Sequence, residues 1–389
     1  MLSYIAEKNL TMKFKALVLV LFLVALAIFL EIINYFRNKP PNTPLKENIS
    51  NIETPKEDEP LKPSLFYGVN VEMSQLLPAS KNYIVNDKGK DLIDIASDLG
   101  INMFRITNGA KVEENSEETF FTKMQWDGVL DKMQEKGIQA LILIESPTMY
   151  QKDIPPEYLD FVQSYIIDSG VLAHPAVFGV DLYNEPLITD RNIELMKTSA
   201  KMVKGSYPKT RLTVGWWAVA TNTYDDDNQE IFKWDDYGAG RIFEDFTDFY
   251  SLHMYGFDKK NLLGIYPDPN QFTRRFISKV KKGLQTKKPL LIGEFGSANG
   301  EAVSDQDTVG SPELQANTYV GVYQALGDLK DEQIIGSVSF QFYQRTSTPD
   351  AWAILKDKGN YYFPAAYVLQ KYAKGNSDVP LSLPLKPVP

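Results

Sequence analysis

The middle of the chain alternates between short runs rich in apolar and β-branched residues and longer segments with helical periodicity. Amphipathic segments such as 90–100, 126–137, 191–208 and 272–285 lie between most of the short runs, and several end in glycine or proline. The short runs occupy residues 65–71, 101–106, 138–146, 176–184, 211–218, 248–256, 288–296 and 334–343. Strands that alternate with helices in this way predict an α/β protein with a (β/α)8 TIM barrel fold. A doubly wound open sheet is the alternative.

The N-terminal pattern is different. Residues Ala16–Leu30 are apolar without interruption, and the apolar character continues beyond Glu31 to Phe36. A helix of about 21 residues spans about 31 Å, close to the hydrocarbon thickness of a bilayer. Arg37 and Lys39 then follow where headgroups would lie. The pattern predicts a single transmembrane helix that holds the long following domain outside the cytoplasm.

A cleaved signal peptide is the alternative for this segment, because Ala25-Leu26-Ala27 has the small residues of a cleavage site. Cleavage there would leave the apolar residues Ile28, Phe29 and Leu30 exposed at the new terminus, so we favour an uncleaved signal-anchor over secretion.

Proline and charge mark the borders of the domains. The stretch 38–63 is proline-rich and charged, and the stretch 375–389 is of the same kind. Both are expected to be disordered, because neither has the apolar residues to build a core. The predicted organisation is therefore a cytoplasmic tip and anchor at 1–37, a linker at 38–63, a barrel at 64–374 and a tail at 375–389.

Composition removes several classes of function. The net charge is −9 and cysteine is absent, which excludes disulfides and thiolate chemistry and disfavours nucleic-acid binding. No glycine-rich phosphate loop follows the first strand, so a dinucleotide cofactor has no support. The acidic run 225–227 matches no calcium-binding spacing. We expect no cofactor, no metal and a monomer.

Polar and aromatic residues gather near the ends of the predicted strands, where the active site of such a barrel lies. Singly, each of these residues would more often be structural, but their joint placement indicates a site. Strand alternation further predicts that Asp181, Tyr183 and Glu185 share one side of the fourth strand. The candidate residues are Arg105, Glu145, Asn184, Glu185, Trp216, Trp217, His253, Tyr255 and Glu294.

Two carboxylates on separate strands suit the cleavage of a glycosidic bond. That reaction needs one carboxylic acid at the leaving oxygen and one carboxylate at the anomeric carbon. Glu185 and Glu294 supply the pair, while Arg105, His253 and Tyr255 would stabilise the ionised form of Glu294. Asn184 offers an amide to a sugar hydroxyl, and the tryptophans offer flat faces to pyranose rings.

Three motifs carry a resemblance to a known family. "LYNEP" after the fourth strand, "LHMYG" after the sixth and "IGEFG" after the seventh are similar to the motifs of retaining glycoside hydrolases of clan A. "FRI" in the second strand fits the same pattern, and the likeness to family 5 cellulases and mannanases covers roughly Leu65 to Tyr372.

The resemblance implies a role for each matching residue. Glu185 would be the acid/base and Glu294 the nucleophile, while Asn184 would contact the 2-hydroxyl of the cleaved sugar. Arg105 and Tyr255 would position Glu294, and His253 would line the subsite.

The chain departs from the family at two strand ends. Glu145 stands where a histidine is usual, and the eighth strand offers Phe340 and Phe342 in place of a tryptophan. Trp352, in the following loop, is expected to substitute for the missing tryptophan as a substrate contact.

The predicted function is that of a membrane-anchored glycoside hydrolase, an endo-β-glycanase-like enzyme with a retaining mechanism. Its partner would be a β-linked polysaccharide or oligosaccharide. The alternatives are a transglycosylase and a barrel that binds polysaccharide without turnover.

Overall fold

The computed structural model of the protein describes residues 65–107, 123–144, 153–217, 223–224, 230–231, 240–257, 267–300, 310–329, 333–343 and 352–376. These residues belong to one compact unit of the chain, Glu53–Pro389. The predicted anchor, the linker 38–63, Glu145, the acidic run 225–227 and the tail beyond residue 376 lie outside the described residues. None of the helices in the described part is long and apolar enough to cross a membrane.

Eight parallel strands close into one barrel, in the order β1-β10-β9-β8-β5-β4-β3-β2. Each coincides with one of the eight apolar runs, so the predicted (β/α)8 fold is confirmed. The strands are β1 Phe66–Glu72, β2 Met103–Thr107, β3 Gln139–Leu143, β4 Val177–Asn184, β5 Arg211–Trp217, β8 Tyr250–Met254, β9 Leu290–Phe295 and β10 Ile334–Ser339.

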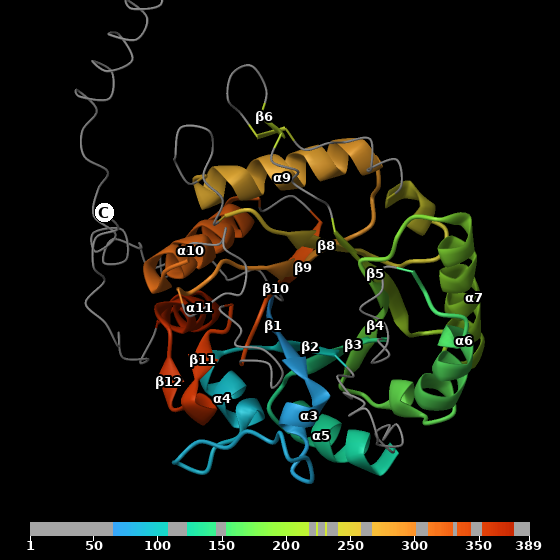
Figure 1. The fold of residues 1–389 in the computed structure, drawn as a ribbon, viewed down its shortest axis with the longest axis horizontal. Helices are drawn as coiled ribbons and strands as arrows, with labels where there is room; N and C mark the ends of the chain where they lie inside the picture. The colour runs from blue at the N-terminus through green and yellow to red at the C-terminus, as the bar shows by residue number, and fades with distance from the viewer. Residues whose placement is uncertain are drawn as a thin grey trace, which may run out of the picture. The chain divides into compact units, whose positions relative to one another are not determined.

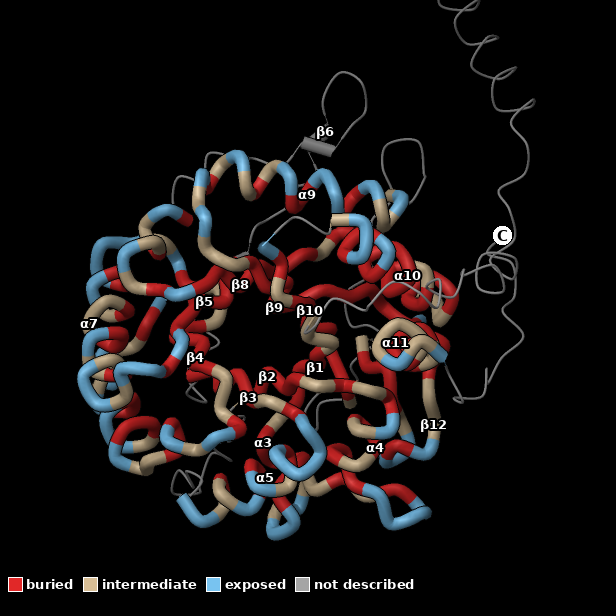
Figure 2. The backbone as a smooth tube through the Cα atoms, turned by 180° about the vertical axis from the view of Figure 1, so that it is seen from behind, coloured by how far each residue is buried: buried red, intermediate tan, exposed pale blue. Residues whose placement is uncertain are grey.

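Helices surround the strands, as the view down the barrel in Figure 1 shows. The longer ones match the amphipathic segments of the sequence, and their outer faces are exposed while the strands are buried (Figure 2). They are α4 Leu92–Leu99, α5 Lys123–Glu135, α7 Asp190–Ser206, α9 Pro269–Leu284, α10 Pro312–Asp328 and α11 Pro364–Lys374. Short helices α3 Met73–Leu76 and α6 Tyr158–Phe161 and a π-helix at Val162–Ile167 complete the ring, with 3-10 turns at Val171–Ala173, Arg241–Phe243 and Asp357–Gly359. Two small hairpins pair β6 Thr223–Tyr224 with β7 Glu230–Ile231 and β11 Leu355–Lys356 with β12 Tyr361–Tyr362.

Local signals in the sequence explain where these helices begin and end. The Asp91 side chain accepts hydrogen bonds from two backbone N–H groups at the start of α4, and Gly100 ends that helix with φ 78°. Ser311 caps α10 in the same way, and Pro312 follows as its first residue. Such stops place the following strand at a fixed point around the barrel.

Apolar side chains fill one end of the barrel interior. They come from strands on opposite sides of the barrel, and the partly buried rings of Phe66 and Phe178 pack beneath them. The cluster consists of Met103, Leu141, Phe249, Leu291 and Val338. The interior is therefore a packed core, which leaves the C-terminal ends of the strands as the place for polar groups.

Candidate active site

Arg105 on β2 is the centre of a buried hydrogen-bond network at the C-terminal ends of the barrel strands. Its Nε donates to Oδ2 of Asp181 at 2.8 Å, and its Nη2 lies 2.8 Å from the same oxygen. Nη2 also donates to Oδ1 of Asn184 at 2.8 Å. Nη1 donates to Oδ1 of Asn70 at 2.8 Å and to Oε1 of Glu294 at 2.5 Å. The contacts use all five N–H donors of the guanidinium group, so one cation fixes four side chains from three strands: Asn70 on β1, Asp181 and Asn184 on β4, and Glu294 on β9.

Glu294 on β9 is held through both carboxylate oxygens. Oε1 accepts from Arg105, and Oε2 accepts from the hydroxyl of Tyr255 at 2.5 Å. Burial, followed by the charge of Glu294, holds the pKa of Tyr255 well above its usual value, so this hydroxyl stays a donor at every working pH. Only 8% of the Glu294 side chain is exposed. The carboxylate is therefore presented in one orientation as an ionised acceptor.

Glu185 reaches the same place from the end of β4. Its φ of 51° lies in the left-handed region, and its backbone N–H donates to the carbonyl of Gly215 at 2.7 Å. A non-glycine residue adopts this conformation only where its surroundings hold it, which is common at functional sites. The turn ends the strand and is followed at once by Pro186. It points the carboxylate into the mouth of the barrel, the open end at which the strands have their C-termini.

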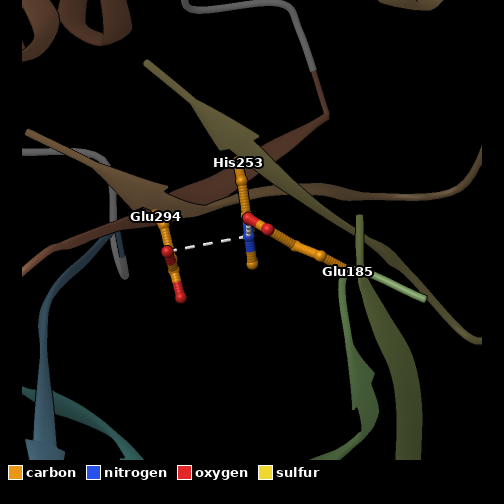
Figure 3. A group of neighbouring side chains, drawn as sticks. All are labelled: Glu185, His253 and Glu294. Atoms are coloured by element: carbon orange, nitrogen blue, oxygen red, sulfur yellow. Dashed lines mark hydrogen bonds and ion pairs between the residues drawn. The ribbon is translucent and has the colours of Figure 1, made fainter. Parts of the chain in front are cut away.

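His253 on β8 lies between the two carboxylates, as Figure 3 shows. Its Nδ1 is 2.7 Å from Oε1 of Glu185 and 3.7 Å from Oε2 of Glu294. The imidazole is completely buried, whereas 22% of the Glu185 side chain is exposed. Glu185 is thus the carboxyl group that solvent or a leaving group can reach.

Within the described residues, Glu185, His253 and Glu294 form a group whose ligand atoms all lie within 4.8 Å of one another. A divalent cation there would sit beside the guanidinium of Arg105, which is 2.5 Å from Glu294, and would displace the hydroxyl of Tyr255. With Arg105 and Tyr255 as its hydrogen-bond donors, Glu294 is better placed to act with Glu185 on a bound molecule than to coordinate a metal ion.

Irregular strand pairing brings these side chains inward. The register of β4 against β5 shifts between Asp181 and Asn184, so both residues contact Arg105 although they are three positions apart. The predicted alternation along β4 was wrong for Tyr183, because its ring packs against Tyr158 of α6 at 5.8 Å, away from the network. A similar shift on β9 lies beside Glu294, which pairs with His253.

Three aromatic rings lie on the side of the network where Tyr255 contacts Glu294. Tyr255, Phe340 and Trp352 contact one another edge to face, with ring centroids 5.4 to 6.4 Å apart. Phe342 lies elsewhere: it is completely buried and packs near Phe104. Of the two phenylalanines in the eighth strand region, only Phe340 is thus close to Tyr255.

The prediction that Trp216 offers its ring to a sugar is corrected by the structure. Trp216 is 4% exposed and packs edge to face against Phe243, because β5 turns Gly215 toward Arg105 and His253 and the next residue toward the helices. The side chain of Trp217 lies outside the described residues, as does Glu145. Both stay predictions.

Two members of the network were missed in the sequence: Asn70 and Asp181 were not named as site residues. Asn70 is 3% exposed and Asp181 is fully buried, yet each accepts a hydrogen bond from Arg105. The available signal was a polar residue within an otherwise apolar strand, in "LFYGVNV" and "AVFGVDLYN". Buried polar groups of this kind need partners, and these find one in Arg105.

Comparison with known proteins agrees with this geometry. The family model described as Cellulase (glycosyl hydrolase family 5) matches residues 62–328. A comparison with curated protein sequences gives no significant match.

Solved structures show the same fold at low identity. A β-glucuronidase from Ruminococcus gnavus is 17% identical, with a TM-score of 0.52 over 82% of this chain and 51% of its own. A GH2 β-galacturonidase from Eisenbergiella tayi is 15% identical, with a TM-score of 0.53 over 81% and 52% of the two chains. A β-D-glucuronidase from Dictyoglomus thermophilum is 14% identical, with a TM-score of 0.54 over 80% and 51%. The chain spans about half the length of these structures, and the likeness concerns the barrel fold.

Proposed function

Since this chain belongs to the cellulase family of glycosyl hydrolases, family 5, we propose that it hydrolyses β-glycosidic bonds of an oligosaccharide or polysaccharide with retention of configuration. One observation carries the proposal. Glu185 and Glu294 present carboxylate oxygens within 4.8 Å of one another from two different strands. Carboxyl groups about 5–5.5 Å apart are expected of retaining enzymes, whereas inverting enzymes need about 6.5–9.5 Å to admit a water molecule.

In the first step, Glu294 acts as the nucleophile. An oxygen of its carboxylate attacks the anomeric carbon and forms a glycosyl ester, while Glu185 gives its proton to the departing glycosidic oxygen. Arg105 and Tyr255 hold Glu294 in line for this attack through the 2.5 Å contacts to its two oxygens. Orientation of this kind lowers the barrier because little motion remains to be restricted.

In the second step, Glu185 acts as the base. It takes a proton from water, the water oxygen attacks the anomeric carbon, and the bond to Glu294 breaks. His253, 2.7 Å from Glu185, keeps that carboxyl group directed into the mouth. The side-chain oxygen of Asn184 accepts a hydrogen bond from Arg105. The amide nitrogen of Asn184 can therefore donate to a sugar hydroxyl.

The test compares Glu294→Ala and Glu185→Ala. Glu294→Ala should abolish turnover of every substrate, and added azide should restore a product of inverted configuration. Glu185→Ala should lose about 10²–10⁴-fold on natural glycosides but still form the intermediate from dinitrophenyl glycosides. Azide should then give a product of retained configuration.

Three results would contradict the proposal. Activity that survives in both variants would show that the carboxylates are not catalytic, and the opposite rescue stereochemistry would reverse their roles. Transfer of sugar to a second sugar in preference to water, seen in the product lengths, would identify a transglycosylase instead.

The apolar run from Ala16 to Phe36 supports a second part of the proposal. We propose that this run anchors the enzyme in a membrane with the barrel outside the cytoplasm. The support is the sequence alone, and the experiment is argued at the end of the Discussion.

A further inference from the structure

Positive charge is concentrated at the end of the barrel opposite the mouth. The first residues of the strands lie at this end, together with the last turns of the helices that lead into them. The segments 204–211, 241–248 and 281–288 lead into the neighbouring strands β5, β8 and β9, and they contain eight Lys and Arg residues against three Asp and Glu residues. These three segments, which we call the basic face, have a net charge of +5, whereas the whole chain has −9.

Contacts between side chains and backbone join the three segments into one surface. Nζ of Lys204, at the end of α7, lies 2.8 Å from Oδ2 of Asp248, just before β8. Nζ of Lys288, just before β9, donates to the carbonyl of Thr247 at 2.6 Å. The basic side chains are therefore neighbours on the same face of the folded chain, although more than 80 positions separate the first from the last.

Four of the basic side chains have no acidic partner within the part of the chain that the structure describes. They are Lys209, Arg211, Lys282 and Lys287, and all four are exposed. A cation in the last turn of a helix stabilises that helix, which accounts for Lys282 in α9. The other three lie beyond the ends of the helices. Their charge is therefore available to an anionic partner.

Aromatic rings lie beside this charge at the N-terminal opening of the barrel. Phe66, the first residue of β1, meets Phe178 of β4 edge to face, with the ring centroids 4.9 Å apart. Cζ of Arg211 lies 4.7 Å from the centroid of Phe178. Both rings are half-buried, so solvent reaches them. Cations beside partly exposed apolar groups are typical of protein surfaces that lie on a bilayer of anionic lipids.

The chain enters the barrel at this same end, because β1 begins at Phe66. The apolar run Ala16–Phe36 is joined to this point through the stretch 37–65. A chain of that length spans about 100 Å when it is fully extended. The connection alone would therefore leave both the height and the orientation of the barrel above a membrane undetermined, and a docking surface would fix them.

We propose that the basic face docks the barrel on the anionic phospholipid headgroups of a membrane, with the active-site mouth turned away from the bilayer. Each Lys or Arg near such a surface strengthens binding by about fivefold, so several together hold a domain that the chain already keeps close. A polymer outside the membrane then has free access to Glu185 and Glu294. The inference rests on the proposed function in its second part, the membrane anchor.

The absence of cysteine makes the orientation measurable, because one introduced cysteine carries the only label. Ser206→Cys places a fluorophore on the basic face, at the exposed last residue of α7. Met124→Cys places it at the mouth end, at the start of α5, where the side chain is 80% exposed. Each full-length variant is reconstituted in nanodiscs of phosphatidylcholine, with or without phosphatidylglycerol. The discs also contain a lipid with a nitroxide headgroup, which quenches only nearby fluorophores.

We expect strong quenching of the Ser206→Cys label in discs with phosphatidylglycerol and weak quenching of the Met124→Cys label. Phosphatidylcholine alone, or 1 M salt, should remove the difference, since salt screens charges beyond about 3 Å. Adding Lys209→Glu and Lys282→Glu should lower the ratio of docked to undocked barrel by about 25-fold or more. The matched control, Lys88→Glu with Lys358→Glu, makes the same change in net charge on exposed loops before α4 and α11 and should leave quenching unchanged. Turnover of a small β-glycoside should be the same in all variants, which also shows that they are folded.

Equal quenching of the two labels would overturn the proposal, as would quenching of the Ser206→Cys label that persists without phosphatidylglycerol or after the charge reversal. Binding of a soluble polyuronate that the charge reversal abolishes, with no quenching by lipid, would assign the face to a polymer and also overturn it. Failure of the anchor would be seen separately, as loss of the full chain from discs of phosphatidylcholine alone. Vesicles of the same lipids, added to the labelled chain, would then still decide whether the face binds them. Failure of the hydrolase would appear only as absent turnover.

Discussion

Arg105 shows how one side chain can set the geometry of a whole site. A guanidinium group is planar and carries five donors in a fixed fork, and each of these donors has an acceptor here. Two of its partners, Asp181 and Glu294, are carboxylates, so the buried positive charge is compensated. A lysine at this position would supply the positive charge but not the planar arrangement of five hydrogen-bond donors.

We therefore expect Arg105→Lys to lower kcat by about 100-fold or more, because Glu294 and Asn184 lose a shared orienting donor. Stability should fall by about 2 kcal/mol, since hydrogen bonds to charged groups are lost inside the barrel. Enzyme kinetics and urea unfolding measure the two effects.

Arg274→Lys is the matched control for this change. Arg274 pairs with Asp328 at 2.6 Å, but the two side chains are 46% and 51% exposed. A surface pair of this kind contributes little to stability. We therefore expect an unchanged kcat and a free energy of unfolding within about 0.5 kcal/mol of that of the original protein. Equal effects of the two substitutions would show that the Arg105 network does not orient Glu294.

At the scale of strands and helices, the sequence predicted the order of the elements well. All eight apolar runs became strands of the barrel because a parallel strand buried on both faces reads as a continuous apolar segment. The two shifts of register on β4 and β9 were not predictable in this way. A bulge depends on the length and twist of the neighbouring strands, so strict alternation placed Tyr183 on the wrong side of β4.

Gly215 in β5 leaves the space in which the side chains of the Arg105 network meet. A Cβ at this position would lie 2.8 Å from Nη2 of Arg105, 2.9 Å from Oδ2 of Asp181 and 2.9 Å from Nε2 of His253. None of these side chains can move aside. Arg105 and Asp181 are paired with each other, and the ring of His253 is completely buried. The glycine is therefore required by close approach of side chains, as is typical of a glycine within a strand.

Gly215→Ala is predicted to lower kcat/KM by about 100-fold, because displacement of reacting groups by about 1 Å has effects of that size. It should also destabilise the protein by about 1–3 kcal/mol through overpacking.

The control for Gly215→Ala is Gly128→Ala in α5, where a new Cβ would have no neighbour within 4 Å. That change should keep activity and raise stability by about 1 kcal/mol, since alanine favours the helix. A fully active Gly215→Ala enzyme would mean that the network tolerates more displacement than its distances imply.

At the scale of the whole molecule, a closed barrel brings together residues that are far apart in sequence. Arg105 and Glu294, which are 189 positions apart, contact each other because parallel strands end at the same mouth. That rule was enough to predict Glu185, His253, Tyr255 and Glu294 as one group. It could not place Trp216, because neighbouring residues of a strand face opposite sides and only the packing of β5 shows which one turns inward.

The proposed anchor is also a property of the whole chain, and its length and apolar character make it testable. The run Ala16–Phe36 would span about 31 Å as a helix, enough to cross the hydrocarbon of a bilayer of about 30 Å. The full chain should then stay with membranes through high-salt and carbonate washes. A fragment that begins at Ser64 should remain in the supernatant with the same kcat/KM, because the barrel residues are all retained.

Leu23→Arg in the full chain separates insertion from adsorption at the membrane surface. A charge at the middle of a spanning helix costs about 2.5–3.5 kcal/mol, so this variant should be released from membranes more easily than the unaltered chain. Recovery of the unaltered chain in the medium with Ile28 as its first residue would contradict the anchor. It would show that the segment is a cleaved signal peptide, and the enzyme would then act away from the membrane.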